Sequence, residues 1–350
     1  MIVALVVSTP GNMARRAEAL REHLPDDWTV RVRVRPDLFE LLALLRDADV
    51  AYVIDAGRNG FAAGAVARAL RRPVVFELGD PQAPLFRVQG RSAAAVSAGA
   101  AIDRLVARRA TGVVVRGREL AQLLDLRVPW AEIPDGVDVD VFAPPADDAT
   151  RAELGVPPER LLAGVIGAVG PPKRRGLGYG WELVEALALT GADVAGLVVG
   201  GGAGLDALER RAAELGVADR TVFTGRVEHA RIPQLIGAMD VCISTQTNDA
   251  VGRARTTAKL PEYLACDRYV LATDVGAAAH VLPPEMRIPY AGSWDPEYPE
   301  KLAERLRALV ARREELRRGV GTRAIAVERY AYPVLARKLA EFLGRVEGER

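Results

Sequence analysis

The sequence predicts an α/β protein of two domains, each with a parallel sheet covered by helices on both faces. Near-continuous apolar strands alternate with amphipathic helices, a pattern typical of buried parallel sheets. The alternation stops in residues 130–145, which are rich in Asp and Pro, and then starts again. The chain has 350 residues, which suits two domains of about 150 residues each. We therefore expect two Rossmann-like domains with their parallel sheets facing across a cleft.

The first half contains short apolar runs separated by longer segments with helical spacing of their apolar residues. Strands are expected at residues 2–8, 28–34, 50–55, 73–80 and 112–117. Helices are expected at residues 12–24, 37–47, 60–72, 94–110 and 118–126. This order predicts an N-terminal domain over residues 1–135.

The second half repeats this order after the connector at residues 130–145. Strands are expected at residues 161–169 and 194–201, with helices at residues 181–190, 204–215 and 259–265. Long helices are expected at residues 301–320 and 332–346. The C-terminal domain is therefore predicted over residues 136–325, with a helix in residues 326–350 that crosses back to the N-terminal domain.

Composition excludes several classes of function. Lys and Arg total 47 and Asp and Glu total 46, so the net charge of +1 gives no argument for a nucleic-acid partner. The two cysteines and three histidines lack the CxxC and HExxH spacings, so neither a protein-bound metal nor a cofactor is expected. The apolar start is too short to span a bilayer, which takes about 20 residues. A cytoplasmic protein is expected, and no sequence feature supports membrane association.

Ligands of open parallel sheets bind beyond the carboxyl ends of the strands, so the loops there are the candidate sites. Gly11, in the loop after the first strand, allows close approach of a ligand or simply a tight turn. Residues 167–180 hold five glycines and three adjacent cations, Lys173 among them, which favours phosphate binding over a plain charged turn. Gly200, Gly201 and Gly202 more simply form a structural turn.

A third loop leads into the helix at residues 259–265. Thr256 or Thr257 is expected to cap this helix, and Pro261 fits only within its first turn. Lys259 adds a full positive charge to the helix start, and Arg253 and Arg255 lie just upstream. These charges predict a diphosphate-binding site at the helix start.

Glu262 lies one turn into the same helix. Its carboxylate is suited to accept hydrogen bonds from ribose hydroxyls. The alternative is a first-turn acid that merely stabilises the helix, by about 0.3–1 kcal/mol.

Residues 130–285 resemble retaining glycosyltransferases of family four, which have the GT-B fold. The resemblance rests on an ordered set of segments, which are IPDGVDVDVFAP, VIGAVGPPKRRG, LVVGGGAGLDALERRAAELGVADRTVFTGRV and KLPEYLACDRYVLATDVGAAAHVL. It implies transfer of a sugar from a UDP- or GDP-sugar to an acceptor, with retention of anomeric configuration and without a bound metal. The donor would bind the C-terminal domain.

The resemblance also implies roles for particular residues. Lys173 takes the place of the family's diphosphate-binding lysine, and Glu262 that of its ribose-binding glutamate. Arg226 follows the strand next to the nucleobase. Thr257 and Lys259 match a Thr-x-Lys-Leu-x-Glu-Tyr variant of the motif.

Three positions depart from the family pattern. A loop arginine is replaced by Ala168, and the first glutamate of the motif by Ala254. A histidine after the fourth strand is replaced by Gly79, with Asp80 beside it. We infer that Lys259 supplies the cation that Ala168 lacks.

The expected mechanism is electrostatic. Lys173 and Lys259 would stabilise the leaving diphosphate, while Asp80 would orient the acceptor or act as a base, unless it is only a turn residue. A non-catalytic GT-B subunit and a nucleotide-sugar epimerase remain alternatives. The acceptor is open, and residues 57–72 and 86–99 either shape its side, touch a membrane or simply pack.

Overall fold

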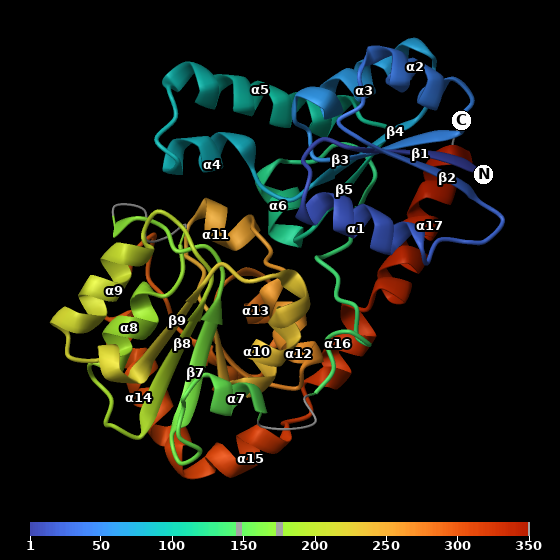
Figure 1. Cartoon of the computed structure of the whole chain (residues 1–350). Helices are drawn as coiled ribbons and strands as arrows, with labels where there is room; N and C mark the ends of the chain where they lie inside the picture. The colour runs from blue at the N-terminus through green and yellow to red at the C-terminus, as the bar shows by residue number, and fades with distance from the viewer. Residues whose placement is uncertain (145–148, 173–177, 349–350) are drawn as a thin grey trace. The chain divides into compact units, whose positions relative to one another are not determined.

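A computed structural model describes residues 1–144, 149–172 and 178–348 of the chain. Contacts divide it into two units (Figure 1). Unit 1 comprises Met1–Asp138, Ala254–Thr256 and Arg329–Arg350, and unit 2 comprises Val139–Arg253 and Thr257–Glu328. The expected boundaries after 135 and 325 each lie three residues before the observed ones. Assigning 254–256 to the C-terminal domain was wrong, because these three residues pack with unit 1.

Unit 1 is built on a six-stranded sheet in the order β2-β1-β3-β4-β5-β6, and all its strand pairs are parallel. The strands are β1 (Ile2–Val7), β2 (Thr29–Val34), β3 (Val50–Ile54), β4 (Val74–Leu78), β5 (Gly112–Val115) and β6 (Trp130–Glu132). Every residue of β3, β4 and β5 is buried, as in the centre of a sheet covered on both faces.

Helices cover both faces of this sheet. They are α1 (Asn12–Arg21), α2 (Leu38–Arg46), α3 (Arg58–Ala69), α4 (Gln82–Val88), α5 (Ala93–Arg109), α6 (Arg118–Leu123) and α17 (Tyr332–Gly348). Alternate residues of β1 serve two separate cores: Ala4 and Val6 pack with α2, α3, α5 and α6, while Leu5 and Val7 pack with α1 and α17. The C-terminal helix α17 therefore lies beside α1, at the two ends of the chain (Figure 1).

Unit 2 has a second six-stranded parallel sheet, in the order β12-β11-β10-β7-β8-β9. Its strands are β7 (Leu161–Ile166), β8 (Val194–Val199), β9 (Thr221–Gly225), β10 (Val241–Ser244), β11 (Tyr269–Thr273) and β12 (Arg287–Ile288). Two parallel sheets confirm the predicted α/β class.

The helices of unit 2 connect these strands and then follow them. They are α7 (Ala149–Glu153), α8 (Trp181–Leu187), α9 (Leu205–Glu214), α10 (Ile232–Ala238), α11 (Ala250–Ala254), α12 (Lys259–Ala265), α13 (Gly276–Val281), α14 (Tyr298–Leu309), α15 (Arg313–Arg318) and α16 (Arg323–Arg329). The α12 helix begins at Lys259, so Pro261 falls in its first turn, as the sequence predicts.

Two expectations about elements were wrong. Residues 130–132, expected to belong to the connector, form the edge strand β6, because they pair with the preceding strand β5. Residues 301–320, expected as one helix, are divided by a 3-10 turn at Val310–Arg312 between α14 and α15.

Asp103 of α5 is a buried carboxylate under the start of α4. Its two oxygens accept long hydrogen bonds from the backbone N–H groups of Gln82 (3.4 Å) and Ala83 (3.3 Å). Burial raises the pKa of Asp103 to about 6, and these two hydrogen bonds only partly offset that effect.

The Asp103→Asn substitution should therefore stabilise the protein near neutral pH. The raised pKa means that protonated Asp103 stabilises the fold below about pH 4 and that this contribution is lost as pH rises through about 6. The difference in unfolding free energy between D103N and wild type should grow by about 1–3 kcal/mol from pH 4 to pH 7. Urea denaturation across this pH range measures it. The exposed control Asp26→Asn should show no such change, and a flat difference for D103N would contradict the assignment.

Candidate functional site

In unit 2, the turns that follow β7 and β8 both contain glycine, and their backbones are in direct contact. Gly167 N donates to Val199 O (2.9 Å), and Val169 N donates to Gly201 O (3.1 Å). A Cβ on Gly200 would overlap the Gly167 carbonyl, and one on Gly202 would overlap that of Val169. Both glycines also have positive φ angles, 135° and 152°. These glycines therefore serve close packing of the two turns, the structural role expected for residues 200–202.

Lys259 lies at the same end of β7. Its Nζ atom lies 2.8 Å from the centroid of the Tyr179 ring, and a Cβ on Gly167 would be 3.1 Å from that nitrogen. The residue is only 7% exposed, so its charge is held in place rather than free in solvent. The side chain thus places a cation beside the turn after β7.

A second contact fixes the helix that carries Lys259. The hydroxyl of Tyr263, fully buried in α12, accepts a hydrogen bond from Ile166 N (2.8 Å), at the last residue of β7. The α12 helix is therefore tied to the end of β7 by both Lys259 and Tyr263. Glu262, between these two residues, is partly exposed.

The start of α12 differs from the expectation in one respect. Its N-cap is Ala258, with no side-chain cap, so neither threonine caps the helix. The Thr256 hydroxyl is used elsewhere, because it donates to Asp135 in unit 1 (2.6 Å). Thr257 instead contributes its carbonyl, which accepts a bond from Leu260 N (3.4 Å).

Arg226 directly follows β9 and is exposed. A Cβ added to Gly201 would lie 3.4 Å from the backbone N of Arg226. Its position therefore adjoins the turn after β8. The contacts Lys259–Gly167, Gly167–Gly200 and Gly201–Arg226 place this set at one edge of the sheet. Lys173 lies outside the described residues.

The two arginines expected beside Lys259 have other partners. Arg253 donates from Nε to the Asn248 side chain (2.7 Å). Arg255 pairs with Asp80 in unit 1, with 3.6 Å between Nε and Oδ1. Their expected contribution to a diphosphate site stays a prediction.

The remaining candidates of unit 1 follow the carboxyl ends of its strands. Gly11 follows β1 with φ of 84°, is exposed, and has open space where a Cβ would be. It forms the N-cap of α1 without a side-chain hydrogen bond. Asp80 follows β4 and precedes Pro81, the N-cap of α4. The sequence left open whether Asp80 is only a turn residue. Its carboxylate also pairs with Arg255.

A buried ion network at this edge of unit 1 was missed. Glu77, fully buried in β4, pairs with Arg16 of α1 (2.9 Å) and accepts a hydrogen bond from the Tyr52 hydroxyl. Burial, and then the charge of Glu77, raise the pKa of Tyr52, so its hydroxyl keeps the proton it donates. The available signal was a lone glutamate in the apolar strand VVFEL, where an unpaired charge would be costly.

Arg116, directly after β5, extends this network. Its guanidinium lies 3.3 Å from Asp135 and 3.5 Å from Asp55. Burial opposes ionisation of Asp135, but the charges of Arg116 and Arg16 outweigh burial and lower its pKa. Burial raises the pKa of Asp55, and Arg116 only partly offsets that effect.

Arg116 also explains the glycine that replaces the family histidine. A Cβ on Gly79 would overlap the Arg116 guanidinium. A larger residue at this position would therefore require Arg116 to leave its ion pairs with Asp135 and Asp55. Ala254, in place of the first motif glutamate, is 1% exposed and belongs to the apolar core of unit 1. A glutamate there would bury its carboxylate among apolar side chains.

Comparison with known proteins finds similarity to glycosyltransferases. Residues 162–312 match the family model of glycosyl transferases group 1. The chain is 32% identical over 168 residues to a 2-deoxystreptamine glucosyltransferase of Streptomyces kanamyceticus, covering 46% of this chain and 43% of that protein. It is 31% identical over 258 residues to a D-inositol 3-phosphate glycosyltransferase of Geodermatophilus obscurus, covering 69% and 52%. The chain thus spans about half the length of these relatives.

Solved structures match over nearly the whole chain. Anabaena Alr3699/HepE in complex with UDP has a TM-score of 0.75 at 18% identity, covering 99% of this chain and all of that one. Sucrose-phosphate synthase from Thermosynechococcus elongatus has a TM-score of 0.73 at 18% identity, covering both chains completely. Within the described part of the chain, no helix has the length and apolarity needed to span a bilayer. The likeness to these solved structures shows that the chain has the GT-B fold, and its residues 162–312 match the model of glycosyl transferases group 1.

Proposed function

We propose that this protein is a retaining glycosyltransferase that transfers a sugar from a nucleotide-sugar donor to an acceptor. The observation that carries the proposal is the buried Lys259 ammonium beside the turn after β7, close to Gly167 and Tyr179. A fixed cation at that edge is suited to stabilise the charge of a departing diphosphate. The similar Alr3699/HepE was solved with UDP and with UDP-glucose, which favours a UDP-sugar over a GDP-sugar as the first donor to test.

In this proposal the chain's own residues have separate roles. Lys259 and Lys173 bind the diphosphate, Glu262 accepts the ribose hydroxyls, and Arg226 lies near the nucleobase. Because the leaving group gains charge as the glycosidic bond breaks, interactions with its oxygens strengthen in the transition state. On the acceptor side we propose Asp80, which is held by Arg255. Gly11 and Thr257 are proposed to contribute to donor binding. We further propose that the reaction proceeds in the cytoplasm and without a protein-bound metal.

Removing the charge of Lys259 should weaken donor binding. Lys259→Met keeps a long unbranched side chain and deletes the ammonium that lies over Tyr179. The affinity for UDP should therefore fall about 10- to 100-fold, which corresponds to one charge-assisted hydrogen bond. Isothermal titration calorimetry measures this, with circular dichroism to verify folding. The exposed control Lys338→Met should bind UDP like wild type. Equal affinity in K259M would contradict the assignment.

The ribose role of Glu262 is separable from the phosphate role of Lys259. Glu262→Gln should weaken UDP binding about tenfold, because a charge-assisted hydrogen bond becomes a neutral one. It should leave the affinity for 2′,3′-dideoxy-UDP unchanged, since that ligand lacks the hydroxyls. The control is Glu209→Gln, an exposed residue of α9. If E262Q weakens both ligands equally, Glu262 acts on the helix rather than on ribose.

The stereochemical course can be tested before the acceptor is known. With UDP-glucose and water as the acceptor, proton NMR should show α-glucose first, before mutarotation, and EDTA should not change the rate. β-Glucose as the first product would contradict retention, and loss of turnover in EDTA would contradict metal independence. Tight donor binding without any turnover would favour the non-catalytic subunit.

A further inference from the structure

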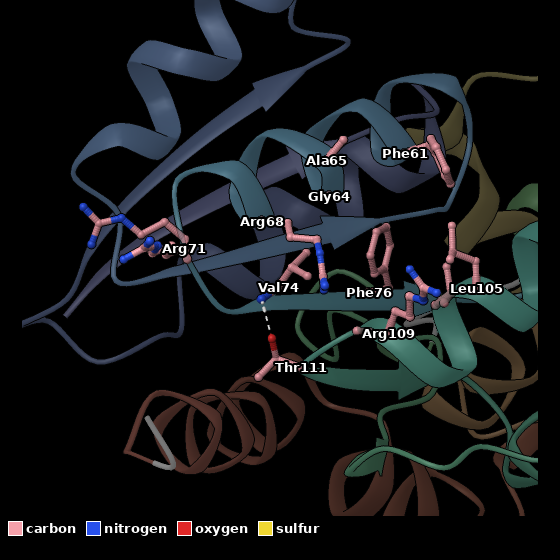
Figure 2. Close-up of a pocket in the computed structure, with 13 residues that line it drawn as sticks. Phe61, Gly64, Ala65, Arg68, Arg71, Val74, Phe76, Leu105, Arg109 and Thr111 are labelled. Atoms are coloured by element: carbon pink, nitrogen blue, oxygen red, sulfur yellow. Dashed lines mark hydrogen bonds between the residues drawn. The ribbon is translucent and has the colours of Figure 1, made fainter.

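Unit 1 contains a cavity that none of the described candidate site residues lines. It measures about 330 Å³ and lies between α3 and α5, at the amino-terminal ends of β4 and β5 (Figure 2). Val74 begins β4 and Thr111 immediately precedes β5, whereas Asp80 and Arg116 follow the opposite ends of these strands. This part of the lining is therefore at the other edge of the sheet from Asp80 and Arg116.

The inner wall of this cavity is apolar. Val74, Phe76, Val106 and Ala110 line it and are each at most 8% exposed. The one hydroxyl in the lining is already engaged, since Thr111 Oγ1 accepts a bond from Val74 N (3.0 Å, the dashed line in Figure 2). This wall therefore offers dispersion and hydrophobic contact rather than hydrogen bonds to a ligand.

Gly64 lets the wall of the cavity pack closely on the α3 side. A Cβ there would lie 2.7 Å from the Phe76 ring, so the ring lies directly against the helix backbone. Leu105 of α5 and the 43%-exposed Phe61 of α3 extend the apolar lining toward solvent.

The rest of the lining is strongly basic. Of the 13 lining residues none is acidic, and four are arginines, namely Arg68, Arg71, Arg72 and Arg109. Arg72 donates one guanidinium hydrogen bond to the Arg46 carbonyl, while its buried Nε has no hydrogen-bond acceptor within the described chain. An anion at the mouth would balance the charge of these arginines.

We propose that this cavity binds a single-chain anionic amphiphile as a free monomer. The acyl chain would lie on the apolar wall, and its carboxylate or phosphate would meet the arginines. The volume lies at the low end of small-molecule sites, about 300–1,000 Å³, which suits one chain rather than a bilayer surface. This assigns a ligand class to residues 57–72, whose role the sequence left open. The inference does not rest on the proposed transferase activity.

The test uses dodecanoate and dodecyl phosphate below their critical micelle concentrations, titrated into the whole protein by calorimetry. One-to-one binding of at least one of them is expected, with dodecan-1-ol and inorganic phosphate each at least about tenfold weaker because each lacks one half of the ligand. Ala65→Trp should weaken binding at least about tenfold, because exposed Ala65 lines the cavity and the indole would fill it.

Charge reversal provides a second, independent variant. Arg68→Glu combined with Arg109→Glu should also weaken binding at least about tenfold. The matched control Arg108→Glu changes an exposed neighbour that does not line the cavity and should stay within about twofold of wild type. UDP affinity should be unchanged in all these variants, which keeps this test separate from that of the transferase.

Several outcomes would overturn the proposal. These are unchanged dodecanoate and dodecyl phosphate affinities in both the Ala65→Trp and the double arginine variant, no binding of either probe to wild type, or an equal loss in the Arg108→Glu control. Binding to anionic phospholipid vesicles without any binding of the monomers would also overturn it, because the site would then be a membrane surface.

Discussion

The buried ion network around Glu77 is the constraint on which the carboxyl edge of unit 1 depends. Glu77 has no exposed surface, and its charge is matched by Arg16 and Arg116 from two other elements. Arg16 also donates to the backbone carbonyls of residues 133 and 134 (2.9 and 2.7 Å), so the chain after β6 is held by the same group. Removing one partner of such a pair leaves a buried charge uncompensated, at a cost of about 3–5 kcal/mol. The network therefore fixes helix α1, strand β4 and the loops after β5 and β6 in a single arrangement.

In unit 2 the equivalent constraint is steric rather than electrostatic. The turns after β7 and β8 approach so closely that their backbones touch, and only glycine leaves room for this at positions 200 and 202. Because the turns support each other, the Gly167 backbone is fixed, and the Lys259 ammonium lies beside it and over the Tyr179 ring. A cation positioned by packing does not have to be ordered when a ligand arrives, which lowers the entropic cost of binding. The proposed donor site owes its preorganisation to this glycine contact.

Local sequence pattern was sufficient for the architecture and for part of the site. Apolar runs predicted the central strands, and Pro261 located the start of α12, because these signals depend only on neighbouring residues. The pattern failed where partners are remote in sequence. Arg16 and Glu77 are separated by 61 positions, and Thr256 and Asp135 by 121, so no spacing rule connects them. The threonine cap failed for the same reason, since a distant carboxylate competed for the hydroxyl.

Two of the departures from the family pattern have a common structural cause in unit 1. The Arg116 guanidinium occupies the space that a side chain at position 79 would need. The neighbouring Gly117 adjoins the segment that holds Ala254, since a Cβ there would lie 3.3 Å from the Ala254 carbonyl. Ala254 itself is packed in the apolar core, where a carboxylate would lack hydrogen-bond partners. The absent histidine and glutamate thus accompany a different packing around Arg116, while Lys259 and Glu262 are retained in unit 2.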